Sequence, residues 1–141
     1  VVFLCSYLHT EIHQYQEENP LYSLVSIMKA APSVNLILMH GGDVRLMEYV
    51  ELARFNENIL IDLSYTILKY KGSSLDLDIQ YLFNTFDRRI CIGTDYPYFT
   101  HEKLRIQFEN LVELSGISEQ KASNIGSQNI LKFLKIDNEQ R

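Results

Sequence analysis

The sequence predicts an α/β fold, on two observations. Four apolar runs alternate with amphipathic segments along the chain, and each run is nearly continuous, as in strands that are buried on both faces of a parallel sheet. Such alternation is typical of α/β proteins. The length of 141 residues fits one domain, residues 1–141. Four parallel βα units amount to half of a (β/α)8 barrel or to a small open sheet.

The first unit is predicted to begin with the strand VVFLCSYL, residues 1–8, followed by a polar loop. A helix should follow, with Asn19 as its N-cap and Pro20 at its first position, because proline fits the first turn of a helix. Pro32 should end this helix. Its buried stripe is predicted to contain Leu21, Leu24, Val25 and Met28.

The second and third units follow the same plan. The strand VNLILMH, residues 34–40, runs into two glycines, and Asp43 is expected to cap the next helix. The third strand is NENILIDLSY, residues 56–65, and the stretch TILKYKGSS, residues 66–74, is the least regular part of the chain. The helix after Asp43 is predicted to bury Leu46, Tyr49, Val50 and Ala53.

The fourth unit closes the pattern. A helix that starts after Ser74 should lead to the strand RICIGTD, residues 89–95. Thr100 is expected to cap the following helix. A last helix, Ser118 to Leu134, is predicted to be broken locally at Gly126.

Composition excludes some classes of protein. The formal net charge of −5 and the pI near 5.3 argue against nucleic-acid binding, which needs clustered Lys and Arg. No run approaches the ~18 to 20 apolar residues of a membrane span. Cys5 and Cys91 lie in apolar runs and form no disulfide or zinc pattern, so the cytoplasm is the expected location. Because Val1 begins inside a strand pattern, we expect the chain to be the C-terminal part of a longer protein.

Polar residues follow or interrupt the predicted strands near their carboxyl ends, which is where parallel sheets carry their chemistry. Imidazole supplies a neutral metal ligand, and a carboxylate supplies charge and a base, so such residues at one sheet edge can bind a divalent metal or exchange protons with water. The candidate residues are Ser6, His9, His40, Asp62, Ser64 and Asp95.

Each candidate has an alternative interpretation. His40 precedes two glycines and is equally consistent with a loop residue, and Asp95 precedes Tyr-Pro, a common turn sequence. Asp62 interrupts an apolar strand, which favours a hydrogen-bonded or metal-adjacent role, but a solvent-facing carboxylate fits as well. His9 lies in a polar loop, where most residues are solvated. The tyrosines that could line a pocket mouth or only cover the core are Tyr65, Tyr70, Tyr96 and Tyr98.

Four segments resemble a known family. NLILMHGG (35–42), NILIDLS (58–64), RICIGTDYP (89–97) and ISEQKASNIGSQNILKFL (117–134) resemble, in this order, the C-terminal half of amidohydrolase-superfamily metal-dependent hydrolases. The nearest branch includes the aminocarboxymuconate-semialdehyde and resorcylate type decarboxylases. The similarity extends over essentially the whole chain, and its most specific pieces are HGG and GTDYP.

This resemblance implies that the chain supplies strands five to eight of a TIM-like (β/α)8 barrel. It implies that Asp95 binds the metal and shuttles a proton for the attacking water, and that His40 binds the metal or contacts substrate or water. The implied cofactor is a divalent ion, Zn in the first place, with Mn or another ion as alternatives. Asp62, Ser64 and Tyr96 are the predicted substrate-binding residues.

The sequence departs from the family pattern in two places. The His-x-His pair of the first strand is absent from this chain. The histidine of strand five is expected at the end of VVFLCSYL, but the register that fits best places Cys5 or Ser6 there. His9 becomes the metal ligand only with a longer or shifted strand. A serine at this position would weaken the metal site.

Three functions are therefore compared. The first is a metal-dependent hydrolase or decarboxylase that acts on a small organic substrate. The second is a degenerate, metal-free barrel that binds or scaffolds other molecules, and the third is an open-sheet domain without catalysis. A half-barrel leaves two sheet edges unpaired, so we also expect a homo-oligomer.

Overall fold

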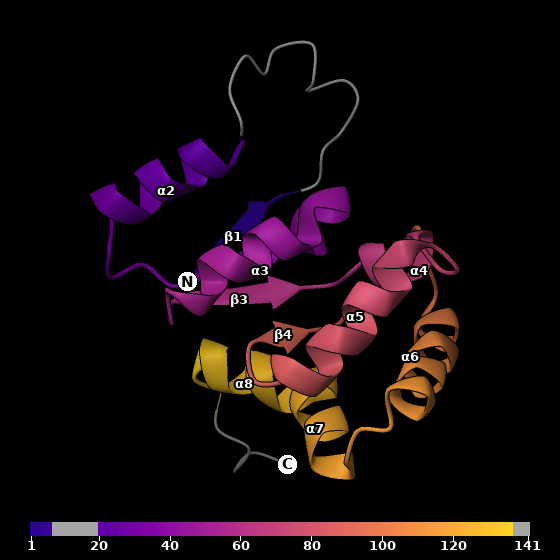
Figure 1. The fold of residues 1–141 in the computed structure, drawn as a ribbon. Helices are drawn as coiled ribbons and strands as arrows, with labels where there is room; N and C mark the ends of the chain where they lie inside the picture. The colour runs from indigo at the N-terminus through magenta and orange to yellow at the C-terminus, as the bar shows by residue number, and fades with distance from the viewer. Residues whose placement is uncertain (7–19, 137–141) are drawn as a thin grey trace.

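A four-stranded parallel sheet forms the centre of the computed structural model, which describes residues 1–6 and 20–136. All neighbouring strands are paired in parallel, in the order β1-β2-β3-β4 (Figure 1). The predicted α/β class is thus confirmed, whereas closure into a barrel stays a prediction. The strands are β1 (Val2–Cys5), β2 (Leu36–Met39), β3 (Ile59–Asp62) and β4 (Ile90–Cys91).

Helices connect the strands and follow the last one. The 3₁₀ segment η1 (His40–Arg45) leads into α3, and the π-helical turn η2 (Asn124–Gln128) separates α7 from α8. The α-helices are α2 (Pro20–Ala30), α3 (Leu46–Arg54), α4 (Thr66–Lys69), α5 (Ser74–Thr85), α6 (His101–Ser115), α7 (Glu119–Ser123) and α8 (Asn129–Leu134).

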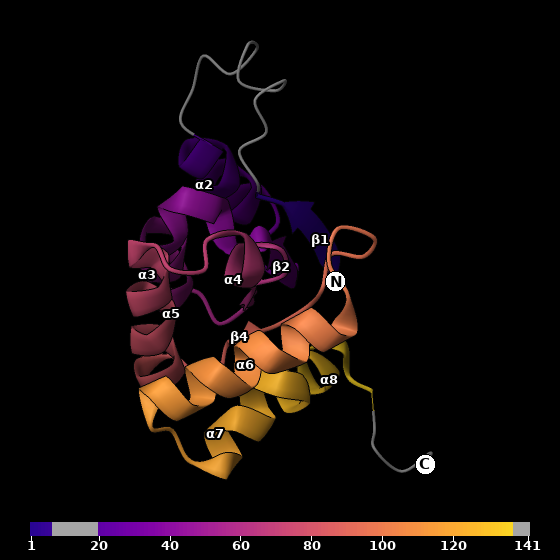
Figure 2. The same ribbon diagram turned by 90° about the vertical axis from the view of Figure 1, so that its right-hand side faces the viewer.

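The two faces of the sheet are covered differently. Alternate strand residues point to opposite faces, and the face that carries Leu38 and Ile61 packs against α2, α3, α5 and α6. The other face carries Ile37, Leu60 and Cys91, which pack against apolar residues of α8. Figure 2 shows α6, α7 and α8 gathered beside β4. On β1 this second face is open, because Phe3, the partner of Ile37, is 58% exposed.

Four predicted elements have different bounds in the structure. The strand expected at 34–40 covers only Leu36–Met39, and His40 already belongs to η1. The strand expected at 89–95 pairs only over Ile90–Cys91, because its neighbour β3 ends at Asp62, the partner of Cys91. The third strand is likewise shorter than 56–65. The stretch 66–74 is not irregular throughout, since it contains α4. The predicted strand residues 7 and 8 and the predicted N-cap Asn19 lie outside the described residues.

The helix caps confirm the prediction for Thr100 and correct the one for Asp43. The side chains of Thr100 and Ser118 accept hydrogen bonds from the backbone N–H groups of Lys103 and Lys121, as N-caps do. Asp43, however, does not cap α3. Positive φ angles at Gly41, Gly42 and Asp43 fold the chain into η1, so α3 begins only at Leu46.

The local break predicted at Gly126 takes the form of η2, a single π-helical turn that contains this glycine. A π-turn inserts one extra residue and changes which side chains face the sheet. It places Ile125 in the main core, while Ile130 and Phe133 of α8 reach the second face.

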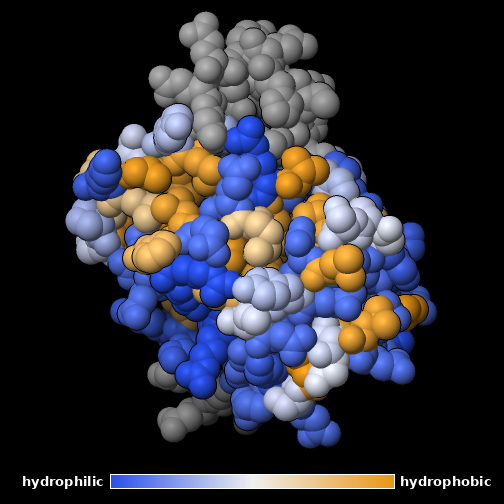
Figure 3. Space-filling model, in the orientation of Figure 1, coloured by the Kyte–Doolittle hydropathy of each residue, from blue (hydrophilic) through white to orange (hydrophobic). Residues whose placement is uncertain are grey.

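The surface combines apolar and charged areas. Figure 3 shows apolar side chains gathered over α2 and the adjoining part of α3, and a groove between these helices is lined by Tyr22, Leu52 and Phe55. Within residues 1–6 and 20–136, no helix has the length and apolar character needed to cross a membrane.

Candidate active site at the carboxyl ends of the strands

Three of the predicted site residues lie at the carboxyl ends of neighbouring strands. His40 follows β2 directly, Asp62 is the last residue of β3, and Asp95 comes four residues after β4. In Figure 1 the arrows of β3 and β4 point to the side of α4, so this edge faces the viewer in Figure 2. The sequence-based placement of these residues at one sheet edge is therefore confirmed.

His40 is held in one orientation by its neighbours. It is 7% exposed, and its ring Nδ1 lies 3.1 Å from the carbonyl oxygen of Ser64. A carbonyl only accepts hydrogen bonds, so Nδ1 is the donor in this contact. The hydroxyl of Thr66 donates to the carbonyl of His40 at 2.7 Å. These contacts fix the Nδ1 side of the imidazole toward the segment that follows β3.

Ser64 joins His40 to Asp62. Its hydroxyl donates to Oδ2 of Asp62 at 2.6 Å, and its backbone N–H donates to Oδ1 at 3.0 Å. The same hydroxyl oxygen lies 3.3 Å from Nδ1 of His40. Gly93 makes this arrangement possible, because a Cβ at that position would lie 3.0 Å from Cβ of Ser64. A chain of hydrogen bonds therefore runs from the carboxylate to the imidazole.

Asp62 responds electrostatically to both other site residues. Burial raises the pKa of the Asp62 carboxyl, and the hydrogen bonds from Ser64 oppose this effect. The charge of His40 also lowers this pKa, whereas the charge of Asp95 raises it. The carboxyl of Asp62 therefore lies within electrostatic reach of both His40 and Asp95.

Cys91 lies on the other side of the Asp62 carboxylate. The two residues are partners in the β3–β4 register, and Sγ of Cys91 lies 3.9 Å from Oδ1 of Asp62. Burial, followed by the charge of Asp62 and their hydrogen bond, raises the pKa of the Cys91 thiol strongly. The thiol is thus a weak donor to the carboxylate and is poorly suited as a nucleophile.

The backbone of this edge is unusual. His40, Tyr65 and Asp95 have φ angles of 66°, 65° and 56°, in the left-handed region that residues other than glycine rarely adopt. Each follows a different strand. Such conformations cost on the order of 1–3 kcal/mol each and cluster at functional sites. Asp95 also forms a turn, since its carbonyl accepts the N–H of Tyr98 at 3.0 Å, as the Asp-Tyr-Pro sequence predicts.

Aromatic rings lie beside His40. The ring centroid of Tyr65 is 5.9 Å from that of His40, 5.6 Å from Tyr98 and 5.5 Å from Phe99. Two of the four predicted pocket-mouth tyrosines, Tyr65 and Tyr98, therefore meet at the site. Tyr96 is 75% exposed, and its predicted contact with substrate stays a prediction.

The strand position opposite His40 is occupied by Ser6. Cys5 pairs with Met39, which places Ser6 level with His40. The hydroxyl of Ser6 donates to the carbonyl of Met39 at 2.5 Å and accepts the N–H of Gly42 at 2.8 Å. Ser6 is thus a buried structural link between β1 and η1. His9, the other candidate for this role, lies outside the described residues.

The residues present fit a divalent ion only in part. An imidazole nitrogen from His40 and a carboxylate from Asp95 are suitable donors for Zn²⁺ or Mn²⁺. Within residues 1–6 and 20–136, however, no group of three or more His, Cys, Asp and Glu side chains could hold a metal ion. A complete site thus needs donors other than the described ones.

Thr66 and Cys91 belong to this site although the sequence analysis did not select them. The strand register, which pairs Cys91 with Asp62, could have identified the cysteine, but no sequence pattern indicates the bond from Thr66 to His40. No protein-family model matches the chain, and no match was found among curated proteins.

Proposed function

We propose that this chain forms the C-terminal half of a (β/α)8 barrel in a metal-dependent hydrolase or decarboxylase of the amidohydrolase type. One observation carries the proposal. His40 and Asp95 follow β2 and β4 at the same sheet edge, and both act electrostatically on Asp62 of the strand between them. A histidine and carboxylates that converge at the carboxyl ends of parallel strands are suited to activating water.

The strand order supports the barrel. Strands in sequential parallel order, with α2, α3 and α5 on one face, are the arrangement of consecutive units in a (β/α)8 barrel. The second face would then line the barrel. Phe3 and Cys5 on that face are exposed, and they would be covered by further strands or by a second copy of the chain.

The proposed division of roles follows from the hydrogen bonds. Nε2 of His40 and the carboxylate of Asp95 would hold the ion. A bound divalent ion would polarise the substrate and lower the pKa of water toward about 7. Asp95 would take up the proton released there. Asp62, through Ser64, would position the imidazole of His40 by fixing its Nδ1 side.

The substrate is proposed to be a small organic molecule, either carboxylated or cyclic. The aromatic side chains of Tyr65 and Tyr98 beside His40 would contact its apolar part. The Ser64 hydroxyl already donates to Asp62, so it would contact substrate only as a hydrogen-bond acceptor. The exposed ring of Tyr96 would contribute at the rim.

Elemental analysis of the purified intact protein tests this proposal. We expect about one equivalent of zinc or manganese for each site, and loss of this metal in His40→Ala and Asp95→Asn. His101→Gln and Asp78→Asn are matched controls, since they change the same residue types in α6 and α5, outside the proposed ligands. Metal content that is unchanged in Asp95→Asn would contradict the assignment.

A metal-free barrel that binds or scaffolds another molecule is the second candidate. Ser6 favours it, because this residue occupies the position opposite His40 and uses its hydroxyl for structural bonds. A well-folded protein that contains no metal, and takes up none when zinc or manganese is added, would support this candidate over the enzyme.

A further inference from the structure

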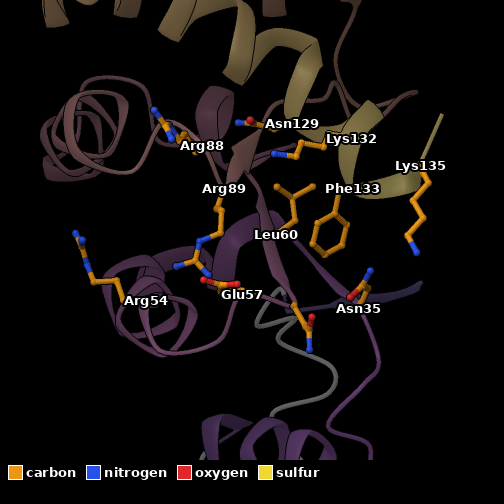
Figure 4. A pocket seen from close by; sticks show the side chains of 11 residues that line it. Asn35, Arg54, Glu57, Leu60, Arg88, Arg89, Asn129, Lys132, Phe133 and Lys135 are labelled. Atoms are coloured by element: carbon orange, nitrogen blue, oxygen red, sulfur yellow. The ribbon is translucent and has the colours of Figure 1, made fainter. Parts of the chain in front are cut away.

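A second cavity lies at the opposite edge of the sheet. Its volume is about 530 Å³, and most of its lining residues precede β2, β3 and β4 or come from α3 and α8, while Leu60 lies in β3 and Lys135 follows α8. Figure 4 shows the side chains around it. Five of the chain's 13 Lys and Arg residues line this cavity, with one carboxylate, Glu57. The cations are Arg54, Arg88, Arg89, Lys132 and Lys135.

Most of these cations are not neutralised by the part of the chain that the structure describes. Arg54 forms an ion pair with Glu51, but no ion pair within residues 1–6 and 20–136 involves Arg88, Lys132 or Lys135. A local excess of positive charge thus stands in a chain whose formal net charge is −5. A cavity that gathers one sign of charge attracts ligands of the opposite sign.

Arg89 is the most firmly held of the cations. Its guanidinium donates to the carbonyl of Asn56 at 2.7 Å and lies 4.8 Å from the ring centroid of Phe86. Burial lowers the pKa of Arg89, and the charge of Arg54 acts in the same direction, although Glu57 opposes it. An anion in the cavity would offset both the burial and the repulsion.

Two of the cations also line a neighbouring hollow. Arg88 and Lys132 line a neighbouring hollow of about 330 Å³, whose other walls include the amides of Gln120 and Asn124. Figure 4 shows the Lys132 side chain extending from α8 toward the side where Arg88 lies, whereas the Arg89 guanidinium lies beside Glu57. Arg88 and Lys132 therefore line both the cavity and the neighbouring hollow.

One wall of the cavity is apolar. Leu60 of β3 and Phe133 of α8 line it together, and Phe133 packs on the cluster that contains Leu60. A pocket with an apolar wall and a few charged side chains suits an amphipathic small molecule. A ligand with an aromatic or aliphatic part and an anionic head would match both sides.

We infer that this cavity binds a phosphorylated small molecule, with its phosphate among Arg88, Arg89 and Lys132 and its apolar part against Phe133. Three cations suit a doubly charged phosphate better than a single carboxylate, because arginine side chains bind phosphate oxygens in pairs. The acidic chain disfavours a nucleic-acid strand, which needs an extended basic surface. None of these residues belongs to the proposed metal site.

Calorimetric titration with phenyl phosphate and with inorganic phosphate tests the inference. We expect the wild-type chain to bind phenyl phosphate more tightly than inorganic phosphate, and more weakly as salt is raised from about 50 to 200 mM. The double variant Arg88→Gln/Lys132→Gln should bind phenyl phosphate at least about tenfold more weakly, since each charge-assisted bond contributes substantially. Both side chains are exposed, so the fold should persist.

The control removes the same number of charges elsewhere. Lys29→Gln/Lys103→Gln changes exposed lysines of α2 and α6, outside the cavity, and should leave the affinity within about twofold. Phe133→Leu should remove most of the preference for phenyl phosphate over inorganic phosphate. Metal content is not a readout here, so these results are independent of the proposed enzyme.

Three outcomes would overturn the inference. In the first, the wild-type chain binds neither phenyl phosphate nor inorganic phosphate. In the second, the control variant loses as much affinity for phenyl phosphate as Arg88→Gln/Lys132→Gln does. In the third, a single-stranded oligonucleotide binds more tightly than phenyl phosphate, and its affinity is unchanged in Arg88→Gln/Lys132→Gln.

Discussion

The two edges of the parallel sheet are built in different ways. At the carboxyl edge, hydrogen bonds of Ser64 connect Asp62 with His40. At the amino edge, arginine and lysine side chains surround a cavity of about 530 Å³, and only Arg54 among them forms a described ion pair. The site residues of the carboxyl edge are thus hydrogen-bonded within the described chain, whereas no described ion pair involves Arg88, Lys132 or Lys135 at the amino edge.

This difference separates two kinds of site. A connected network holds a few groups in fixed orientations, which suits chemistry that depends on the position of a proton. Exposed cations around a hollow bind by charge and tolerate variation in position. Variants at each edge should therefore have different effects on stability, and they are ordered below from the largest expected effect to the smallest.

Gly42→Ala should have the largest effect, because it tests how closely the carboxyl edge is packed. A Cβ at Gly42 would lie 2.2 Å from Cδ2 of Tyr49, and the φ angle is already 83°. Together, overpacking and the left-handed backbone should lower the free energy of unfolding by about 3 kcal/mol or more. Urea denaturation of the purified chain measures this loss.

Gly72→Ala is a matched control for that prediction. Gly72 has the same φ of 83°, but a Cβ there would meet nothing within 4 Å. Gly72→Ala should lower the free energy of unfolding by about 1 kcal/mol, from backbone strain alone. Equal losses in the two variants would show that the packing of Gly42 against Tyr49 is not what stabilises this edge.

Asn129→Asp tests the polar connection that attaches α8 at the amino edge. The buried Nδ2 of Asn129 donates to the carbonyls of Asp87 at 2.6 Å and of Ile90 at 2.7 Å. A carboxylate would face two carbonyl oxygens without a proton to donate, which should cost about 2–3 kcal/mol in the free energy of unfolding. Thermal and urea unfolding both measure this cost.

The control for this variant is an asparagine that donates the same kind of hydrogen bonds but is not buried. Nδ2 of Asn84, an exposed residue, donates to the carbonyls of Gln80 at 3.2 Å and Ser115 at 3.0 Å. Asn84→Asp should cost less than about 1 kcal/mol, because water can solvate the new carboxylate. A cost as large as that of Asn129→Asp would refute burial as the cause.

Asp62→Asn should have the smallest effect, and one that depends on pH. Burial raises the pKa of Asp62 above its ordinary value of 3.8, so the folded state binds this proton more tightly than the unfolded state. The free energy of unfolding of the wild type should therefore fall as the pH rises from about 4 through the folded-state pKa. In Asp62→Asn this decrease of the free energy of unfolding with pH should be absent.

Because the variant keeps an acceptor for Ser64, it should be less stable than the wild type by about 1 kcal/mol near pH 4, with a smaller difference at pH 7. Urea unfolding of both proteins across this range measures the difference, and Asp78→Asn is the control. A difference that grows with pH would mean that the Asp62 carboxylate is stabilised in its charged form.

The order of the strands and the edge that carries the polar residues could be predicted from the sequence. Apolar runs ending in His40 and Asp62 are local patterns, and the parallel alternation brings their carboxyl ends together. The N-caps Thr100 and Ser118 were equally predictable, because capping depends on only three or four residues. The prediction that Asp43 caps α3 was wrong because the two preceding glycines have positive φ angles, which delay the start of the helix.

Sequence by itself therefore determined the α/β class, the parallel strands and the chemical character of the carboxyl edge, since these follow from local periodicity and residue type. Only the tertiary structure decided that Ser64 connects Asp62 with His40, that Ser6 occupies the position opposite His40, and that five cations line one cavity at the amino edge. Those contacts join residues far apart in the chain, and their geometry depends on strand register and helix packing, which no short segment encodes.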